Sequence, residues 1–255
     1  MHLRWPVQFE NRAVRIPRLM RGTLTLLGAL LWLGAAGCSR QDAGQPASPA
    51  ITEPQHESSA GRSDLPDDRP VIVAFGDSLT AGRGVDTEQN YPSQLQRKLD
   101  REGYRYRVAN AGVSGDTSAQ GLNRIASVRE LRPVIVIVEL GANDGLRGLP
   151  VEATRQNLDA IVSQLTAEGA NVILAGMALP PNYGASYTGA FSRIFPDLAR
   201  LHKAALIPFF LQGVAGHPEL NQEDGIHPTA QGYSIVVENI WAVLKPMILR
   251  KTRSG

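Results

Sequence analysis

Apolar residues follow two alternating patterns between residues 70 and 250. Short continuous apolar runs predict strands that are buried on both faces of a parallel sheet. These runs cover residues 71–75, 107–110, 133–140 and 171–176, and a fifth strand is expected at 206–211. Between the runs, apolar residues recur at helical spacing: Leu95 and Leu99; Leu158, Ile161, Val162 and Leu165; Ile235, Ile240, Leu244 and Met247. This alternation predicts an α/β domain with right-handed crossovers and helices on both faces of the sheet.

Polar and glycine residues follow the predicted strands. In open parallel sheets, ligands bind at the carboxyl ends of the strands. The first strand is followed by Gly-Asp-Ser-Leu at 76–79, the second by Gly112, and the third by Gly-Ala-Asn-Asp at 141–144. Asp-Gly-Ile-His at 224–227 precedes the last helix. We therefore expect a functional site where these four segments meet.

Three of these residues can form a nucleophilic triad. A serine hydroxyl needs a base to accept its proton, and the base needs an acid to orient it. Ser78, His227 and Asp224 supply these three groups, with the acid three residues before the histidine. Acyl transfer also needs donors for the developing oxyanion. The backbone N–H groups of Ser78 and Gly112 and the side-chain amide of Asn143 are the candidate donors.

Each segment also has a structural interpretation when taken alone. Gly-Asp-Ser after a strand is typical of a turn with a helix N-cap, and Asn143 or Asp144 can be caps as well. Asp224 and His227 can be turn residues before a helix that begins with proline. His202 and His217 are rival bases, but neither has an acid three residues before it.

Taken together, the four segments resemble the conserved blocks of the GDSL or SGNH hydrolases, in the same order and without a departure. The resemblance implies that Ser78 is the nucleophile, that Gly112 and Asn143 are oxyanion donors, and that Asp224 and His227 complete the triad. It also implies a flavodoxin-like three-layer α/β/α sandwich with five parallel strands in the order 2-1-3-4-5. The surrounding stretches are similar to the branch that contains thioesterase I, also described as arylesterase and lysophospholipase.

Other classes of function lack support in the sequence. Residues 1–38 contain five arginines and one acid, so the formal net charge of +2 hides a remainder of the chain with 21 bases and 23 acids. We therefore expect no nucleic-acid partner. Gly-rich nucleotide motifs and the metalloprotease motif H-E-x-x-H are absent, and the chain has one cysteine. No cofactor and no metal are expected.

Two segments are candidates for contact with the substrate. Leu146 and Arg147 lie between two glycines directly after Asn143, and we expect a mobile lip on an acyl groove there. Residues 177–195 are expected to form a long surface loop, which carries Tyr183 and Tyr187. The alternative is that these aromatic residues only cover the sheet. Glu139 is an acid in an otherwise apolar strand, and the sequence leaves open whether it is structural or tunes the site.

The N-terminal segment predicts export. Arginines precede a charge-free stretch at 22–39, which is the order of a signal peptide. Ala-Ala-Gly before Cys38 resembles the lipobox of bacterial lipoproteins, in which the cysteine is lipidated. We expect a signal at 1–37, a flexible tether at 38–69, the hydrolase domain at 70–250 and a tail at 251–255. Secretion without lipid, a retained membrane anchor and a translation start at Met20 remain alternatives.

The sequence as a whole predicts a lipid-anchored serine hydrolase, held by Cys38 at the outer membrane and facing the periplasm. Its expected substrates are fatty-acyl or aryl esters, lysophospholipids and acyl thioesters. An O-acetyl esterase that acts on envelope polysaccharide is an alternative within the same resemblance. A non-catalytic module that binds acyl lipids is an alternative of another class.

Overall fold

The computed structural model describes residues 67–253, and for residues 251–253 the backbone only. The predicted signal, Cys38 and the tether up to residue 66 lie outside the described residues. The strands are β1 Val71–Gly76, β2 Arg107–Gly112, β3 Ile135–Glu139, β4 Asn171–Ala175 and β5 Ala205–Ile207. The helices are α1 Ser78–Ala81, α2 Tyr91–Arg101, α3 Ser118–Asn123, α4 Ile125–Glu130, α5 Ala142–Leu146, α6 Val151–Ala167, α7 Ala185–His202 and α8 Ala230–Arg253, with short 3-10 turns η1 Thr87–Gln89, η2 Pro181–Tyr183 and η3 Pro218–Leu220.

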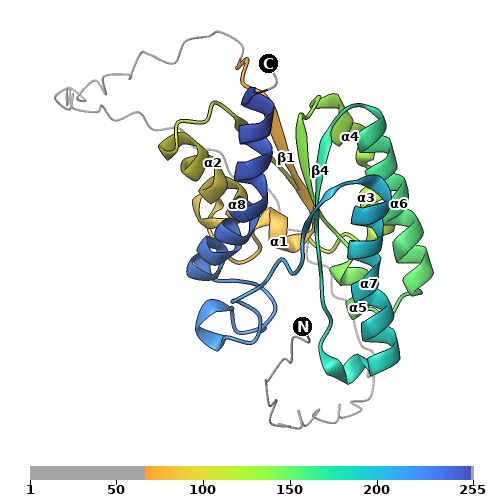
Figure 1. The fold of residues 1–255 in the computed structure, drawn as a ribbon. Coiled ribbons are helices and arrows are strands. Elements are labelled where there is room, and N and C mark those ends of the chain that lie inside the picture. The colour runs from red at the N-terminus through yellow and green to blue at the C-terminus, as the bar shows by residue number, and fades with distance from the viewer. Residues whose placement is uncertain (1–66, 254–255) are drawn as a thin grey trace, which may run out of the picture. The chain divides into compact units, whose positions relative to one another are not determined.

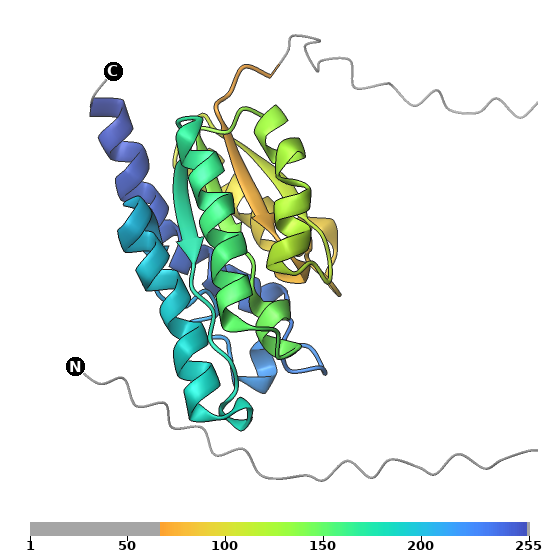
Figure 2. The same cartoon turned by 90° about the vertical axis from the view of Figure 1, so that its right-hand side faces the viewer.

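The five strands form one parallel sheet in the order β2-β1-β3-β4-β5, as predicted. Every residue of β1 and β3 is buried, which explains their continuous apolar runs. Helices α2 and α8 lie side by side on one face of the sheet, and α3, α4, α6 and α7 cover the other (Figure 1). Figure 2 shows this second layer from the front. The structure is therefore the predicted three-layer sandwich.

The C-terminal half differs from the prediction in two places. Strand β5 ends at Ile207, so residues 208–211 are not part of it. The expected loop at 177–195 is mostly the beginning of α7. The apolar residues Phe191, Ile194, Phe195 and Leu198 bury one face of this helix at spacings of three and four. Gly184, Gly189 and Pro196 hid that pattern, although a glycine or proline inside a helix only weakens it.

No helix between residues 67 and 253 is both long enough and apolar enough to cross a membrane.

Candidate active site

Ser78 lies at the turn between β1 and α1. Asp77 is the N-cap of α1, and its Oδ1 accepts a hydrogen bond of 3.0 Å from the Leu79 N–H. This cap makes Ser78 the first residue of the helix and leaves its side chain 7% exposed. Gly76 permits the turn because a Cβ there would lie 2.6 Å from the carbonyl oxygen of Glu139. The Gly-Asp-Ser segment is thus a capped turn and also the place of the candidate nucleophile.

The structure brings the three predicted triad residues together. Ser78 Oγ lies 2.8 Å from His227 Nε2, although the two residues are 149 positions apart in the chain. His227 Nδ1 lies 2.6 Å from Asp224 Oδ2. The His227 side chain is 7% exposed and thus shielded, whereas the Asp224 side chain is 41% exposed. A chain of hydrogen bonds therefore leads from the carboxylate through the imidazole to the serine hydroxyl.

Asp224 is held as an anion by the loop that carries it. Its Oδ1 accepts hydrogen bonds from the backbone N–H groups of Ile226 and His227, at 3.1 and 3.0 Å. Burial acts to raise the pKa of Asp224, but the hydrogen bonds from the His227 ring and these two N–H groups outweigh it and lower that pKa below 3.8. An ionised acid at this position fixes the imidazole with its Nε2 toward the serine.

Of the two other predicted oxyanion donors, Asn143 contacts Asp77, the residue before Ser78, whereas the Gly112 N–H is directed elsewhere. The Asn143 amide donates to Asp77 Oδ2 at 2.9 Å and to the Asp116 carbonyl at 3.0 Å. The N–H of Gly112 is already bonded to Asn110 Oδ1 at 2.9 Å. A Cβ on Gly112 would lie 2.2 Å from the Ala81 nitrogen, so this glycine lets β2 pack against α1. In this structure the Gly112 N–H is bonded to its own loop, so it is not free to act as the predicted oxyanion donor.

A different glycine is better placed. Gly115 has a φ of +88°, and its neighbour Asp116 accepts the hydrogen bond from Asn143. Within residues 67–253, the N–H groups of Gly115 and Ser78 have no hydrogen-bond acceptor. Gly115 was not among the predicted donors. The available signal was its place in the stretch Ser-Gly-Asp-Thr, three residues after Gly112. A free N–H next to the Asn143 amide is the property that an oxyanion donor requires.

Buried ionic and polar contacts fix the backbone around these donors. Arg124 forms an ion pair of 2.6 Å with Asp116 and donates to the carbonyl oxygens of Ala111 and Gly76, at 2.8 and 2.9 Å. Its guanidinium carbon also lies 4.6 Å from the centre of the Phe75 ring. Arg124 therefore connects the ends of β1 and β2 to the Asp116 loop, which no sequence motif had indicated.

Asp144 is structural. It is buried, and its carboxylate accepts hydrogen bonds from the backbone N–H and hydroxyl of Ser118, at 2.7 and 2.5 Å. Ser118 is the first residue of α3. Asp144 is not itself an N-cap residue, but its carboxylate accepts the first backbone N–H of α3 and so connects the loop of Asn143 to the start of that helix.

The segment 145–150 is held by three side chains. Arg147 donates to the Gly115 carbonyl at 2.8 Å. The Tyr183 hydroxyl donates to the carbonyl of Leu146 at 2.9 Å, and the Tyr187 hydroxyl donates to that of Leu149 at 2.7 Å. The two tyrosine hydroxyls, predicted as substrate contacts, are thus used to hold this segment. The predicted lip is bonded to the Gly115 loop on one side and to α7 and its preceding turn on the other.

The two other folded histidines do not compete for the role of base. His202, on α7, lies 2.5 Å from Asp159 of α6. His217 lies 3.4 Å from Glu219, and both side chains are exposed. Neither histidine contacts Ser78.

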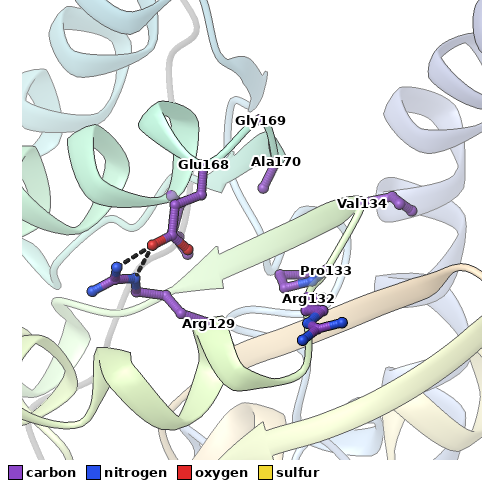
Figure 3. A pocket seen from close by; sticks show the side chains of 8 residues that line it. Arg129, Arg132, Pro133, Val134, Glu168, Gly169 and Ala170 are labelled. Atoms are coloured by element: carbon purple, nitrogen blue, oxygen red, sulfur yellow. Dashed lines mark hydrogen bonds and ion pairs between the residues drawn. The ribbon is translucent and has the colours of Figure 1, made fainter.

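A surface pocket of about 450 Å³ lies at the opposite end of the sheet. Its lining includes Val134 and Ala170, which directly precede β3 and β4, and the ion pair of Arg129 with Glu168 (Figure 3). No serine, threonine, cysteine or histidine is among the residues that line it, and its one carboxylate, Glu168, is paired with Arg129. The chemistry is therefore at the carboxyl ends of the strands, away from this pocket.

The fold and the serine, histidine and aspartate geometry define a serine hydrolase of the SGNH type. Residues 74–235 match the model of the GDSL-like Lipase/Acylhydrolase family, and the chain belongs to that family.

Several named proteins are similar to this chain. Esterase TesA from Pseudomonas aeruginosa is 48% identical over 179 residues, which is 70% of this chain and 89% of that protein. The thioesterase 1/protease 1/lysophospholipase L1 of Escherichia coli is 38% identical over 179 residues, 70% of this chain and 85% of that protein. The crystal structure of the psychrotrophic esterase EstA from Pseudoalteromonas, inhibited by monoethylphosphonate, superimposes with a TM-score of 0.67 at 34% identity, over 70% of this chain and 98% of that one. The chain is thus an ester-hydrolysing serine hydrolase.

Proposed function

We propose that hydrolysis proceeds through an acyl-enzyme on Ser78. His227 takes the proton from Ser78 Oγ as the oxygen attacks the ester carbonyl carbon, and it returns this proton to the departing alcohol. Water then attacks the acyl-enzyme and gives a proton to His227. As the acyl bond to Ser78 Oγ breaks, His227 returns that proton to the serine oxygen, which releases the carboxylic acid and restores the free serine and the neutral imidazole. The observation that carries the proposal is the continuous chain of hydrogen bonds in the site. Ser78 Oγ lies 2.8 Å from His227 Nε2, and His227 Nδ1 lies 2.6 Å from Asp224 Oδ2.

The developing oxyanion is stabilised by Ser78 N–H, Gly115 N–H and the Asn143 amide. The first two donors have no acceptor among the residues that the structure describes. One hydrogen of the Asn143 amide is directed to Asp77, and the other, which the Asp116 carbonyl accepts, is shared with the oxyanion. Three preorganised donors in a partly buried site support the tetrahedral intermediate more strongly than water does.

The natural substrate class is acyl esters of lipids, including lysophospholipids. Relatives with the names esterase, arylesterase and lysophospholipase support this class, and so does the predicted lipid anchor, which brings the enzyme to a membrane surface. Thioesters of coenzyme A are cytosolic, so their cleavage is expected only in the test tube. Leu146 and Arg147 form the border of the acyl site in this proposal, because their segment directly follows Asn143.

Membrane attachment through Cys38 is part of the proposal. Two acyl chains suffice for stable anchoring, at about 0.8 kcal/mol for each buried CH₂. Replacement of Cys38 with serine is expected to release the enzyme into the soluble periplasmic fraction with unchanged hydrolysis of a soluble ester. Continued sedimentation with the membrane fraction would contradict a lipid anchor, and sedimentation with the inner membrane would favour a retained N-terminal helix.

The deciding experiment is a series of p-nitrophenyl esters from acetyl to palmitoyl, together with a lysophospholipid. We expect kcat/KM to rise with chain length beyond acetyl and the lysophospholipid to be cleaved. An optimum at acetyl with loss of activity by hexanoyl would favour the O-acetyl esterase alternative. A fluorophosphonate that does not label Ser78 would favour the binding module.

A further inference from the structure

A buried acid lies directly behind the nucleophile turn. Glu139 ends β3 and pairs with Gly76 at the end of β1. Its side chain is fully buried at 0% exposure. Its Oε2 accepts hydrogen bonds from Thr80 Oγ1 at 2.7 Å and from the backbone N–H of Asp77 at 3.2 Å. A Cβ on Gly76 would lie 2.4 Å from this oxygen, so the glycine before Asp77 also makes room for the acid.

The other oxygen, Glu139 Oε1, is buried and receives no hydrogen bond from any residue in the described part of the chain. An ionised carboxylate with an oxygen in this condition is strongly disfavoured. A protonated carboxyl carries no charge, so its burial costs much less than that of the ionised form. Oε2 is therefore a hydrogen-bond acceptor, and Oε1 is the oxygen that can carry the proton.

The groups around Glu139 are acidic. Asp77 is 1% exposed. The buried hydroxyl groups of Tyr91 and Tyr233 are the other titratable groups near Glu139. The charge of His227 acts to lower the pKa of Asp77. Burial and the charge of Asp77 raise the pKa of Glu139 well above 4.5, and a hydrogen bond between the two side chains raises it further. Burial raises the pKa of Asp77 to about 6, and the hydrogen bonds from the Leu79 N–H and from Glu139 act against that rise. Since two adjacent buried carboxyls do not both ionise, the pair retains a proton.

Asp77 has the contacts of an anion. Its Oδ1 accepts from the Leu79 N–H and its Oδ2 from the Asn143 amide, at 3.0 and 2.9 Å. Both oxygens are therefore acceptors, whereas Glu139 has an oxygen without a donor. This asymmetry assigns the proton of the pair to Glu139.

We propose that Glu139 is a positioning residue for ester hydrolysis: its protonated carboxyl donates a hydrogen bond to the Asp77 carboxylate, which in turn aims the Asn143 amide at the oxyanion. The inference rests on the proposed function of Asn143. Glu139 itself touches no reacting atom, and its effect passes through Asp77. A small error in the direction of the Asn143 amide weakens a bond that forms fully only in the transition state, so kcat is affected more than KM.

The test compares two replacements of Glu139. Glu139→Gln keeps a neutral donor of the same shape, and we expect kcat within about 3-fold of wild type. Glu139→Met removes the donor, and we expect kcat to fall by roughly 10- to 100-fold with KM within about 2-fold, a part of the loss for one complete oxyanion donor. Equal damage in both variants would show that an ionised Glu139 is needed, and no damage in Glu139→Met would remove its role; either result overturns the inference.

A matched control separates positioning from stability. Ile137 is fully buried in β3, two residues before Glu139 and on the same face of the sheet. Ile137→Ala is expected to lower the melting temperature but to leave kcat within about 2-fold of wild type. If Ile137→Ala lowers kcat as much as Glu139→Met at matched stability, the effect is structural and the inference fails.

Coupling to Asp77 provides the specific readout. In an Asp77→Asn background, Glu139→Met is expected to cause less than about a 2-fold further loss of kcat, because its effect passes through the Asp77 carboxylate. A full independent loss in the double variant would contradict that route. If Glu139→Met does not fold, the infrared difference spectrum of wild type minus Glu139→Gln at neutral pH decides: a protonated carboxylic acid C=O band supports the inference and its absence overturns it.

The experiments also distinguish this inference from the proposed function. Phosphonate labelling of Ser78 and the effect of Asn143→Ala test the proposed function alone. If both behave as expected and the Glu139 variants do not, only the inference about Glu139 is lost.

Discussion

The two ends of the sheet contain acids and bases in opposite environments. At the amino ends of β3 and β4, Arg129 and Glu168 border the 450 Å³ pocket, and their side chains are 40% and 41% exposed. At the carboxyl ends, Asp77, Ser78, Glu139 and His227 are all buried. Exposed pairs contribute little to stability, whereas buried polar groups persist only when their neighbours satisfy them. Buried, mutually bonded polar groups therefore mark the active site here, and the volume of a pocket does not.

The sharpest test of this comparison is the nucleophile. Ser78→Ala is expected to lower kcat by roughly 10⁴- to 10⁶-fold, because the hydroxyl is the atom that attacks the ester. The measurement is p-nitrophenyl ester turnover, with phosphonate labelling and circular dichroism to confirm an intact but unreactive fold. Residual activity within 100-fold of wild type would place the nucleophile elsewhere.

The second prediction concerns the oxyanion donor. Asn143→Ala is expected to lower kcat by on the order of 10²- to 10³-fold with little change in KM, since the amide stabilises charge that develops only in the transition state. Asn171→Ala is the control at the other end of the sheet, where the amide donates to the Val134 carbonyl at 3.2 Å. That variant is expected to retain full turnover. Equal activity in the two variants would exclude Asn143 from the site.

The third prediction concerns how stability depends on pH. The pKa of Glu139 is raised in the fold, so its contribution to stability is complete below pH 4.5 and is lost as pH rises toward the folded value. This loss amounts to about 1.4 kcal/mol for each pH unit. Glu139→Gln removes this dependence. The free energy of unfolding, measured in urea at pH 5 and at pH 8, should therefore change in favour of the variant at the higher pH; a constant difference between the two proteins would contradict a neutral Glu139.

The smallest effect is expected at the amino ends of the strands. Glu168→Gln breaks an exposed ion pair with Arg129 and should change the melting temperature little, without an effect on kcat. Thermal melts at low and high salt and ester turnover are the measurements. A large loss of turnover in this variant would give the pocket at this end a functional role and weaken the contrast between the two ends.

Local patterns predicted most of the fold and the triad. Strands β1 and β3 are buried on both faces, so their continuous apolar runs were easy to interpret. Ser78, Asp224 and His227 followed from side-chain chemistry and from their positions next to such elements. Helix α7 was not predicted because Gly184, Gly189 and Pro196 are poor helix formers, although Phe191 and Leu198 belong to an apolar face at helical spacing.

The glycine among the oxyanion donors could not be predicted in the same way. Gly112 and Gly115 are both glycines near the end of the same strand, and composition does not distinguish them. The difference is one of contacts: the Gly112 N–H is bonded to Asn110 and its Cα faces α1, whereas the Gly115 N–H has no acceptor among residues 67–253. Whether a backbone group is free depends on the conformation of the whole loop.

The sequence by itself determined the alternation of strands and helices and the identity of the nucleophile, base and acid, because burial and side-chain chemistry are properties of local residues. The tertiary structure alone decided which donors are free, that Tyr183 and Tyr187 hold the segment after Asn143, and that Glu139 meets Asp77 across 62 positions of the chain. Such contacts join residues from different strands and helices, and the packing of the sheet and its helices sets the distances between them.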